Sequence, residues 1–508
     1  MTSSSQVGST RLGVSGEMTG RKGGASRRCV AFFAAAVLLL AAAPGTNWTK
    51  APVDPALASG GYALLRVGHG AAGAVAALAV AAGATDVAAL DTIDIVTARV
   101  SEDAVRALRS DARVAFIAAD TIVTAVGKDD HYEKAGGKPS PGVTVIGAER
   151  AWSRSTGRGV TVALMDTGVA RHPDLEGSVV TQIDFVGDGA TQLDPSGHGT
   201  FVAGLIAAHG ERFKGVAPDA KLVSLRVLDQ KGQGTMHSVL AAFDWLLHNR
   251  VAYHIRVLNL SFGAKQTTSY HRTLLAGVVE SAHFAGIAVV AAAGNAGPGS
   301  HSVSMPGADP FVITIGSLDD QGTVETKDDR ESTFSGRGPT RDGFAKPDVL
   351  APGEHIVSLR VPGVALDRED KEGSNVSAYA RLTGTSASSA MAAGAAALVL
   401  QAHTDYSPTQ VKGALVAGGR DVNGTRTPAV DAAASLGARP ARVNAGVAPS
   451  AALMKVLVAS GQISGSVNWD GITWEGITWE SVTWEGVTWE SVSWESVTWE
   501  SVTWEARS

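Results

Sequence analysis

The sequence has little cysteine, little net charge and no apolar run long enough to cross a membrane comfortably. Its single cysteine, Cys29, excludes an intramolecular disulfide. The net charge of −6 over 508 residues is too small to indicate nucleic acid as a partner. The apolar run at 30–43 has fourteen residues, fewer than a membrane-spanning helix needs. With 44% hydrophobic residues the chain can still bury a large core, and its length predicts two to four segments.

Residues 1–43 have the features of a signal peptide. A basic flank ending in Arg27-Arg28 precedes the apolar run, and small residues at 41–43 offer a cleavage site. An alternative cleavage site at 56–58 would extend the segment to residue 58. The competing interpretation, a buried N-terminal helix, does not explain the basic flank or the small residues. We expect an exported protein, extracellular or held at the cell surface, with general secretory and twin-arginine export both open.

Residues 59–126 show the pattern of a small α/β sandwich. Strand-like segments at 62–67, 93–100, 114–117 and 122–125 alternate with helical segments at 71–82 and 101–109. Ser101 is placed to cap the second helix. A segment of this size is marginally stable by itself. Residues 127–141 are polar and rich in Gly and Pro, which predicts a linker.

Residues 142–436 alternate between apolar strands and helices. The expected strands are 160–165, 222–228, 255–260, 287–293 and 311–315, and the expected helices are 200–209, 235–249, 271–285, 386–403 and 408–416. Continuous apolar strands between helices predict an α/β domain with a mostly parallel sheet covered on both faces. In such sheets functional groups gather just beyond the carboxyl ends of the strands.

The run that follows Gly384-Thr385-Ser386 is made almost wholly of small apolar residues. This composition predicts a helix that is buried on every side. Ser386 would then lie in the first turn, in the positive field of the helix N-terminus. Such a position suits a helix-capping residue and a nucleophile equally, so the triplet alone does not decide between them.

Two motifs upstream decide the question. Asp166 ends an expected strand, and His198 stands at the start of an expected helix; each by itself is usually structural. The order Asp, His, Ser on an α/β sheet, however, is one of the orders found in serine triads. A serine hydroxyl needs an imidazole to accept its proton, and the imidazole needs an acceptor on its other nitrogen. We therefore expect Asp166, His198 and Ser386 to be catalytic.

Asn295 follows another apolar strand and is flanked by glycines at 294 and 297. Its side-chain amide is a donor suited to a developing oxyanion, although Asn in such a segment is also a common turn residue.

These motifs together resemble the subtilisin-like serine proteases of peptidase family S8. The resemblance covers residues 145–436 and rests on Asp166-Thr167-Gly168, His198-Gly199-Thr200, Ser261-Phe262-Gly263, Ala293-Gly294-Asn295 and Gly384-Thr385-Ser386. It implies a secreted endopeptidase that works through an acyl-enzyme. In that reaction Asp166 orients His198, His198 is general base and acid, and Asn295 lines the oxyanion hole with the Ser386 amide.

The resemblance also implies how polypeptide substrates bind. Ser261, Phe262 and Gly263 would pair with the substrate as an extra strand. Gly232 and Gly234 would form the opposite edge of the cleft, with Ala293 and Gly294 beside it. Residues 59–126 are similar to an inhibitor-type (I9-like) propeptide, which implies an intramolecular inhibitor and folding chaperone cut near residue 126 or within the linker.

Three positions depart from the family pattern. Ala390 and Met391 stand where the family usually has Pro and His, and Phe201 replaces a common His. We expect these changes to affect packing only. Residues 209–214 are too short for the Asn-rich calcium loop of many relatives. No metal ligand or cofactor is predicted, and a structural Ca²⁺ stays open because such sites leave little linear signature.

Residues 437–468 read as a linker, and residues 469–508 form a tail with eight tryptophans spaced five residues apart. The tail holds eight acidic residues and one Arg, a net charge of −7, which leaves the rest of the chain at +1. A period of five places the rings on no single face of a strand or helix. Three interpretations stay open: a solvated tail, an anchor that contacts cell wall or carbohydrate, and self-association.

Two other functions are compatible with the sequence. The protease-like domain could be a scaffold for a surface-binding tail, or the same acyl-enzyme chemistry could join peptides rather than hydrolyse them.

Overall fold

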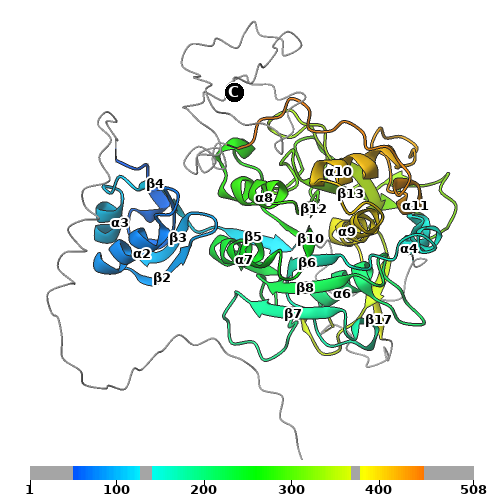
Figure 1. Ribbon diagram of the computed structural model, residues 1–508, viewed down its shortest axis with the longest axis horizontal. Coiled ribbons are helices and arrows are strands. Elements are labelled where there is room, and N and C mark those ends of the chain that lie inside the picture. The colour runs from blue at the N-terminus through cyan, green and yellow to red at the C-terminus, as the bar shows by residue number, and fades with distance from the viewer. Residues whose placement is uncertain (1–49, 126–139, 368–377, 451–508) are drawn as a thin grey trace, which may run out of the picture. The chain divides into compact units, whose positions relative to one another are not determined.

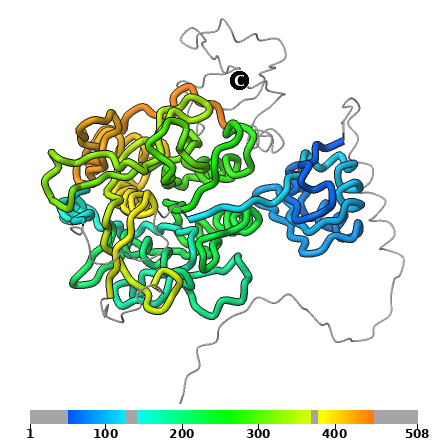
Figure 2. The backbone as a smooth tube through the Cα atoms, turned by 180° about the vertical axis from the view of Figure 1, so that it is seen from behind, coloured from blue at the N-terminus to red at the C-terminus, as the bar shows by residue number. Residues whose placement is uncertain are grey.

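The computed structural model describes residues 50–125, 140–367 and 378–450, all within one compact unit that begins at Lys50. The expected signal peptide at 1–43, most of the linker at 127–141 and the tail at 469–508 lie outside the described residues. The described chain has two regions, which we call the N-terminal module (residues 50–125) and the main domain (residues 140–450). Strand β5 (Ile122–Ala125) leaves the module and enters the main domain (Figure 1, Figure 2).

The N-terminal module is a four-stranded antiparallel sheet with two helices. Its elements are β1 (Gly61–Val67), α2 (Ala72–Ala81), β2 (Thr85–Leu90), β3 (Ile95–Val100), α3 (Glu102–Leu108) and β4 (Val114–Ala119), and the strand order is β2-β3-β1-β4. Alternate residues of β1 face opposite sides, as strand geometry requires. Ala63 and Leu65 join the core of the module, whereas Leu64 joins a core of the main domain.

Two features of the module differ from the sequence expectations. Strand β2 was not expected, because only two of its six residues, Thr85 and Val87, are β-branched and only Leu90 is buried. Strand β5 was expected to close the module but pairs instead with two segments of the main domain. The predicted helix cap is confirmed, since the Ser101 hydroxyl accepts a hydrogen bond from the Ala104 amide at 3.2 Å.

The main domain is built on an eight-stranded sheet. Its path is β14-β13-β12-β10-β6-β8-β7, with β15 also paired to β13. The strands are β6 (Thr161–Asp166), β7 (Val179–Asp184), β8 (Lys221–Arg226), β10 (Ile255–Leu260), β12 (Ala288–Ala292), β13 (Ile313–Asp319), β14 (Arg330–Glu331) and β15 (Val349–Pro352). All pairings are parallel except β13 with β14. The predicted α/β class with a mostly parallel sheet is confirmed.

Helices cover both faces of this sheet, as predicted. The main helices are α6 (His198–Ala207), α7 (Met236–Asn249), α8 (Leu274–Phe284), α9 (Thr385–Ala402) and α10 (Pro408–Ala417), with short helices α4 (Gly142–Val145), α5 (Ala148–Ala151) and α11 (Ala432–Ser435). One core cluster joins α6, α9 and α10 to one face of the sheet, and a second joins α7 and α8 to the other. Along β6, Leu164 belongs to the first cluster and Met165 to the second, so the strand is buried on both sides.

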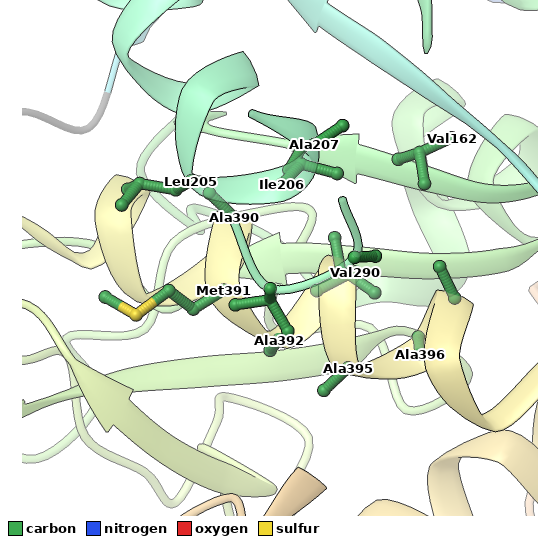
Figure 3. Packing of buried hydrophobic residues seen from close by; sticks show 14 of the residues in the cluster. Val162, Leu205, Ile206, Ala207, Val290, Ala390, Met391, Ala392, Ala395 and Ala396 are labelled. Carbon is green, nitrogen blue, oxygen red and sulfur yellow. The ribbon is translucent and has the colours of Figure 1, made fainter. Parts of the chain in front are cut away.

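Helix α9 is the central helix of the first core. Every residue from Thr385 to Leu400 is buried, which confirms the helix predicted to be buried on all sides. Its small side chains allow α6 to approach closely, and Figure 3 shows Ala390, Met391 and Ala392 of α9 near Leu205 and Ile206 of α6. This contact places the N-terminal residues of both helices near the carboxyl ends of the strands.

The folded region continues past residue 436. The Ala441 amide donates to the Gly413 carbonyl, the Tyr270 hydroxyl donates to the Ala448 carbonyl, and Ser450 is fully buried. The smaller strands β16 (Ile356–Leu359) and β17 (Tyr379–Leu382) form a separate antiparallel pair. Within the described residues, no helix combines the length and apolarity required to span a membrane.

Candidate active site

Asp166 and His198 are brought together by the end of one strand and the start of one helix. Asp166 is the last residue of β6, and His198 is the first residue of α6. The Asp166 Oδ1 atom lies 2.7 Å from His198 Nδ1, and both side chains are buried. Gly199 permits this approach, because a Cβ there would lie only 2.0 Å from the Gly168 carbonyl oxygen.

Opposing effects set the protonation of His198. Its burial by itself lowers the pKa, because desolvation penalises the imidazolium. The negative charge of Asp166, the hydrogen bond to Asp166 and the charge of Asp194 outweigh burial and leave the pKa of His198 above 6.5. The Nδ1 atom is committed to Asp166, so Nε2 is the nitrogen that remains for exchanging a proton with a reacting group.

Ser386 lies at the carboxyl end of the strand next to Asp166. Its hydroxyl donates to the Ser261 carbonyl at 3.2 Å, and Ser261 directly follows β10. Strands β10 and β6 are paired with Leu260 opposite Met165, so Ser261 and Asp166 come next in register on neighbouring strands. Neighbouring strands lie about 4.8 Å apart. The structure therefore gathers the three predicted catalytic side chains at one rim of the sheet.

Asn295 is held by the first turn of α9. Its Oδ1 atom accepts hydrogen bonds from the Thr385 amide at 3.1 Å and from the Thr385 hydroxyl at 2.8 Å. This fixes the amide group with its oxygen toward α9, so its NH₂ group lies on the other side. An NH₂ held in this way beside Ser386 can donate to a carbonyl oxygen under attack.

Asp194 was missed by sequence reasoning, although it is fully buried beside the pair. Its carboxylate accepts hydrogen bonds from Thr167, which follows Asp166, and from Thr200 in the first turn of α6. Burial raises the pKa of Asp194, and the hydrogen bonds from Thr200, Gly197 and Thr167 oppose that rise. No motif marks this residue in the linear sequence, because an Asp four residues before a His is common in loops.

The chain itself fills the expected substrate cleft. Strand β5 lies between β11 (Phe262–Gly263) and β9 (Gln233–Thr235), antiparallel to both. Ala125 is opposite Phe262, and its amide donates to the Gly232 carbonyl at 2.7 Å. Val123 is opposite Gly234 and is fully buried.

Four other predicted cleft residues are Gly263, Gly294, Ala293 and Ser261. Gly263 and Gly294 both face the Ser304 hydroxyl, since a Cβ on either would approach it within 2.6 and 2.8 Å. The Ala293 carbonyl accepts a hydrogen bond from the Ser304 amide at 2.9 Å. The Ser261 hydroxyl lies 3.1 Å from that of Ser389 on α9 and donates to the Ser386 carbonyl at 3.5 Å, while the Ser261 carbonyl accepts from the Ser386 hydroxyl.

The Subtilase family model matches residues 157–433 of this sequence, more than half of the chain. The chain belongs to the subtilase family. Serine protease AprX of Bacillus subtilis (strain 168) is 40% identical over 266 residues, covering 51% of this subtilase and 60% of that protein. An alkaline protease of Alkalihalobacillus alcalophilus is 33% identical over 326 residues, covering 63% and 73% respectively.

A solved structure agrees with the family assignment. Fervidolysin from Fervidobacterium pennivorans, described as a keratinolytic enzyme related to subtilisin, is 25% identical to this subtilase with a TM-score of 0.60. The match covers 78% of this chain and 64% of that one. Because the structural match extends over most of this subtilase, the subtilisin-like fold predicted from the motifs is confirmed.

The three departures from the family pattern lie in the core. Phe201, Ala390 and Met391 are buried in the cluster that joins α6 to α9, and Figure 3 shows Ala390 and Met391 there. Residues 209–214 form a tight turn in which His209 pairs with Lys214. Among the described residues of this subtilase, no group of three or more His, Cys, Asp or Glu side chains is arranged to hold a metal ion.

Proposed function

We propose that this subtilase is an exported serine endopeptidase, made as a proprotein, in which Asp166, His198 and Ser386 form the catalytic triad. The observation that carries the proposal is the Asp166–His198 hydrogen bond at the rim that Ser386 shares, beside a cleft filled by an extended strand. Family membership supports the same reaction class. Export is supported by the apolar run 30–43 and its basic flank.

In the proposed reaction His198 Nε2 takes the Ser386 hydroxyl proton as the oxygen attacks the carbonyl carbon of a bound peptide. The Asn295 NH₂ and the Ser386 amide donate to the oxyanion that forms. His198 then gives the proton to the leaving amine, and the C–N bond breaks to leave an acyl-enzyme. A water molecule, deprotonated by His198, hydrolyses the ester and restores Ser386.

Residues 59–126 are proposed to inhibit the enzyme until they are cut. Strand β5 pairs with both edges of the cleft, as a bound polypeptide substrate would. Ser261, Phe262, Gly263, Gly232, Gly234, Ala293 and Gly294 are the proposed substrate-binding residues. Strand β5 ends at Ala125, and the proposed cut lies near residue 126 or within the linker at 127–141.

The substitution Ser386→Ala tests the proposal. We expect it to abolish both casein hydrolysis and removal of the N-terminal segment, because no other group at the rim replaces the hydroxyl. Secreted wild-type and variant protein are compared by N-terminal sequencing and by labelling with a serine-directed fluorophosphonate probe. Normal processing in the variant would refute the assignment. Ser389→Ala, a buried serine one turn further along α9, is the matched control.

The same preparation separates hydrolysis from peptide joining. Mass spectra of products formed from a peptide substrate in the presence of an amine-bearing acceptor peptide are expected to contain hydrolysed fragments. A majority of ligated products would show that this acyl-enzyme is a transferase.

A further inference from the structure

Asp194 receives five hydrogen bonds and makes no ion pair with a described cation. Its Oδ1 atom accepts from the Thr167 hydroxyl at 2.8 Å and from the amides of Ser196 and Gly197 at 3.2 and 2.8 Å. Its Oδ2 atom accepts from the Thr200 amide at 2.8 Å and from the Thr200 hydroxyl at 2.6 Å. The residue is fully buried. A buried carboxyl with this many partners is held in a single orientation.

All five partners of Asp194 are suited to donate to it. Three of them are backbone amides, which can only donate. The hydroxyls of Thr167 and Thr200 already accept from the amides of Gly199 and Ala170 and have their own protons to offer Asp194. An ionised carboxylate accepts all five hydrogen bonds.

These bonds connect the two elements that carry the catalytic pair. Thr167 follows Asp166 at the end of β6, and its amide donates to Asp166 Oδ1 at 2.7 Å. Thr200 lies in the first turn of α6, two residues after His198. Gly197, the N-cap residue of α6, has no side chain, so Asp194 supplies the acceptor that a capping side chain would otherwise provide.

We propose that Asp194 is a positioning residue for the proposed reaction, whose carboxylate joins the first turn of α6 to the loop after β6 and so fixes His198 against Asp166. The inference rests on the proposed function. None of the five hydrogen bonds of Asp194 reaches β5 or a cleft residue described above, so it acts through His198. A buried catalytic group displaced by a fraction of an ångström loses rate rather than substrate affinity.

The variant Asp194→Asn tests this, because it keeps the shape of the side chain while removing its charge and one acceptor. With the mature enzyme and a chromogenic peptide substrate, we expect kcat to fall about tenfold with little change in KM. The acid limb of kcat/KM should move to lower pH, since one of the two carboxylates that favour protonated His198 is lost.

Two companion variants separate position from charge. Thr167→Val and Thr200→Val each remove one hydroxyl and keep the Asp194 charge, so kcat should fall while the acid limb stays in place. Asp184→Asn is the matched control, because this carboxylate at the end of β7 shares Arg226 with Asp188 and the ion pair to Asp188 persists. It should change neither kcat nor the pH profile.

The outcomes distinguish this inference from the proposed function. If Ser386→Ala removes activity but Asp194→Asn keeps wild-type kcat and an unmoved acid limb, Asp194 is only a helix cap and the inference is overturned, whatever its thermal stability. If Ser386→Ala is fully active, the proposed function is wrong, and the inference that rests on it is overturned with it. Should Asp194→Asn not fold, unchanged kcat in both threonine variants would overturn the inference equally.

Discussion

The N-terminal module and the main domain bury the faces of their sheets in different ways. The main domain covers both faces of its sheet with its own helices, and its two core clusters are continuous from strand to strand. The module covers one face with α2 and α3, whereas Leu64, Leu90 and Ile95 on the other face belong to the core cluster of α7. The module therefore completes its burial only on the main domain, which makes it a dependent part of the fold.

The largest expected effect comes from removing a side chain from the face of the module that packs on the main domain. This face, formed by Leu64, Leu90 and Ile95, is called the shared face. In full-length Ser386→Ala protein, Ile95→Ala should lower the unfolding free energy of the module by about 2–5 kcal/mol, because a buried side chain leaves a cavity. Ile117→Ala, in the core that the module forms by itself, is the matched variant. Urea unfolding followed by limited proteolysis measures both.

The two variants sharpen the comparison between the regions. A loss for Ile117→Ala with none for Ile95→Ala would mean that the module is self-sufficient. Equal losses in both would show that the shared face matters as much as the internal core.

A smaller loss of stability is expected at acid pH, and only in the main domain. Burial, followed by the charge of Lys412, lowers the pKa of His283 to about 3, so the folded domain keeps this ring neutral. The unfolded chain takes up the proton near 6.5, and stability is therefore lost as pH falls from 6.5 toward 3. The module has one described histidine, His69, whose side chain is 49% exposed.

The variant His283→Asn isolates this contribution. Burial raises the pKa of Asp309 to about 7 and that of Asp320 to about 6, which stabilises the fold in acid and opposes His283. Both carboxyls are present in wild type and variant, so their contributions cancel in the difference between the two unfolding free energies. This difference should change by about 1.4 kcal/mol per pH unit below 6.5 in urea titrations. A pH-independent difference would contradict the assignment.

The smallest expected effect concerns the polar edge of the shared face. His237 on α7 lies 2.6 Å from an Asp120 carboxylate oxygen and stacks on Tyr62 with ring centroids 4.3 Å apart. His237→Ala should weaken docking of the module by about 1 kcal/mol, since both contacts are partly exposed. His248→Ala, exposed further along α7, is the control, and faster processing of the full-length protein is the measured result.

The rim that carries the proposed triad could be predicted from the sequence because its residues follow strands and begin helices. Asp166, His198 and Ser386 each stand beside glycines at such a boundary, and the buried composition of α9 is visible in its letters. Asp194 could not be predicted, because its role depends on two threonines brought near it by different elements. Strand β5 was recognised as a strand, yet its partners were not, since register between distant segments leaves no local signal.

Edge strands were the other elements that sequence reasoning missed. Strands β2 and β7 are half-exposed and carry polar or small residues, so neither shows the apolar run of a central strand. Strand β15 is short and ends at Pro352. Propensity identifies strands mainly through burial, which β2 and β7 lack, whereas β15 is fully buried but has only four residues.

Ser450, the last described residue of the main domain, is anchored more firmly than a chain end usually is. Its amide and hydroxyl both donate to the carboxyl group of Glu280, which is itself fully buried in α8. A mechanical force applied to any part of the chain beyond this point would be transmitted to the interior of α8, and not to the short helix α11 (Ala432–Ser435). If the tryptophan repeats attach to a surface, the enzyme would be tethered through this fixed point on α8.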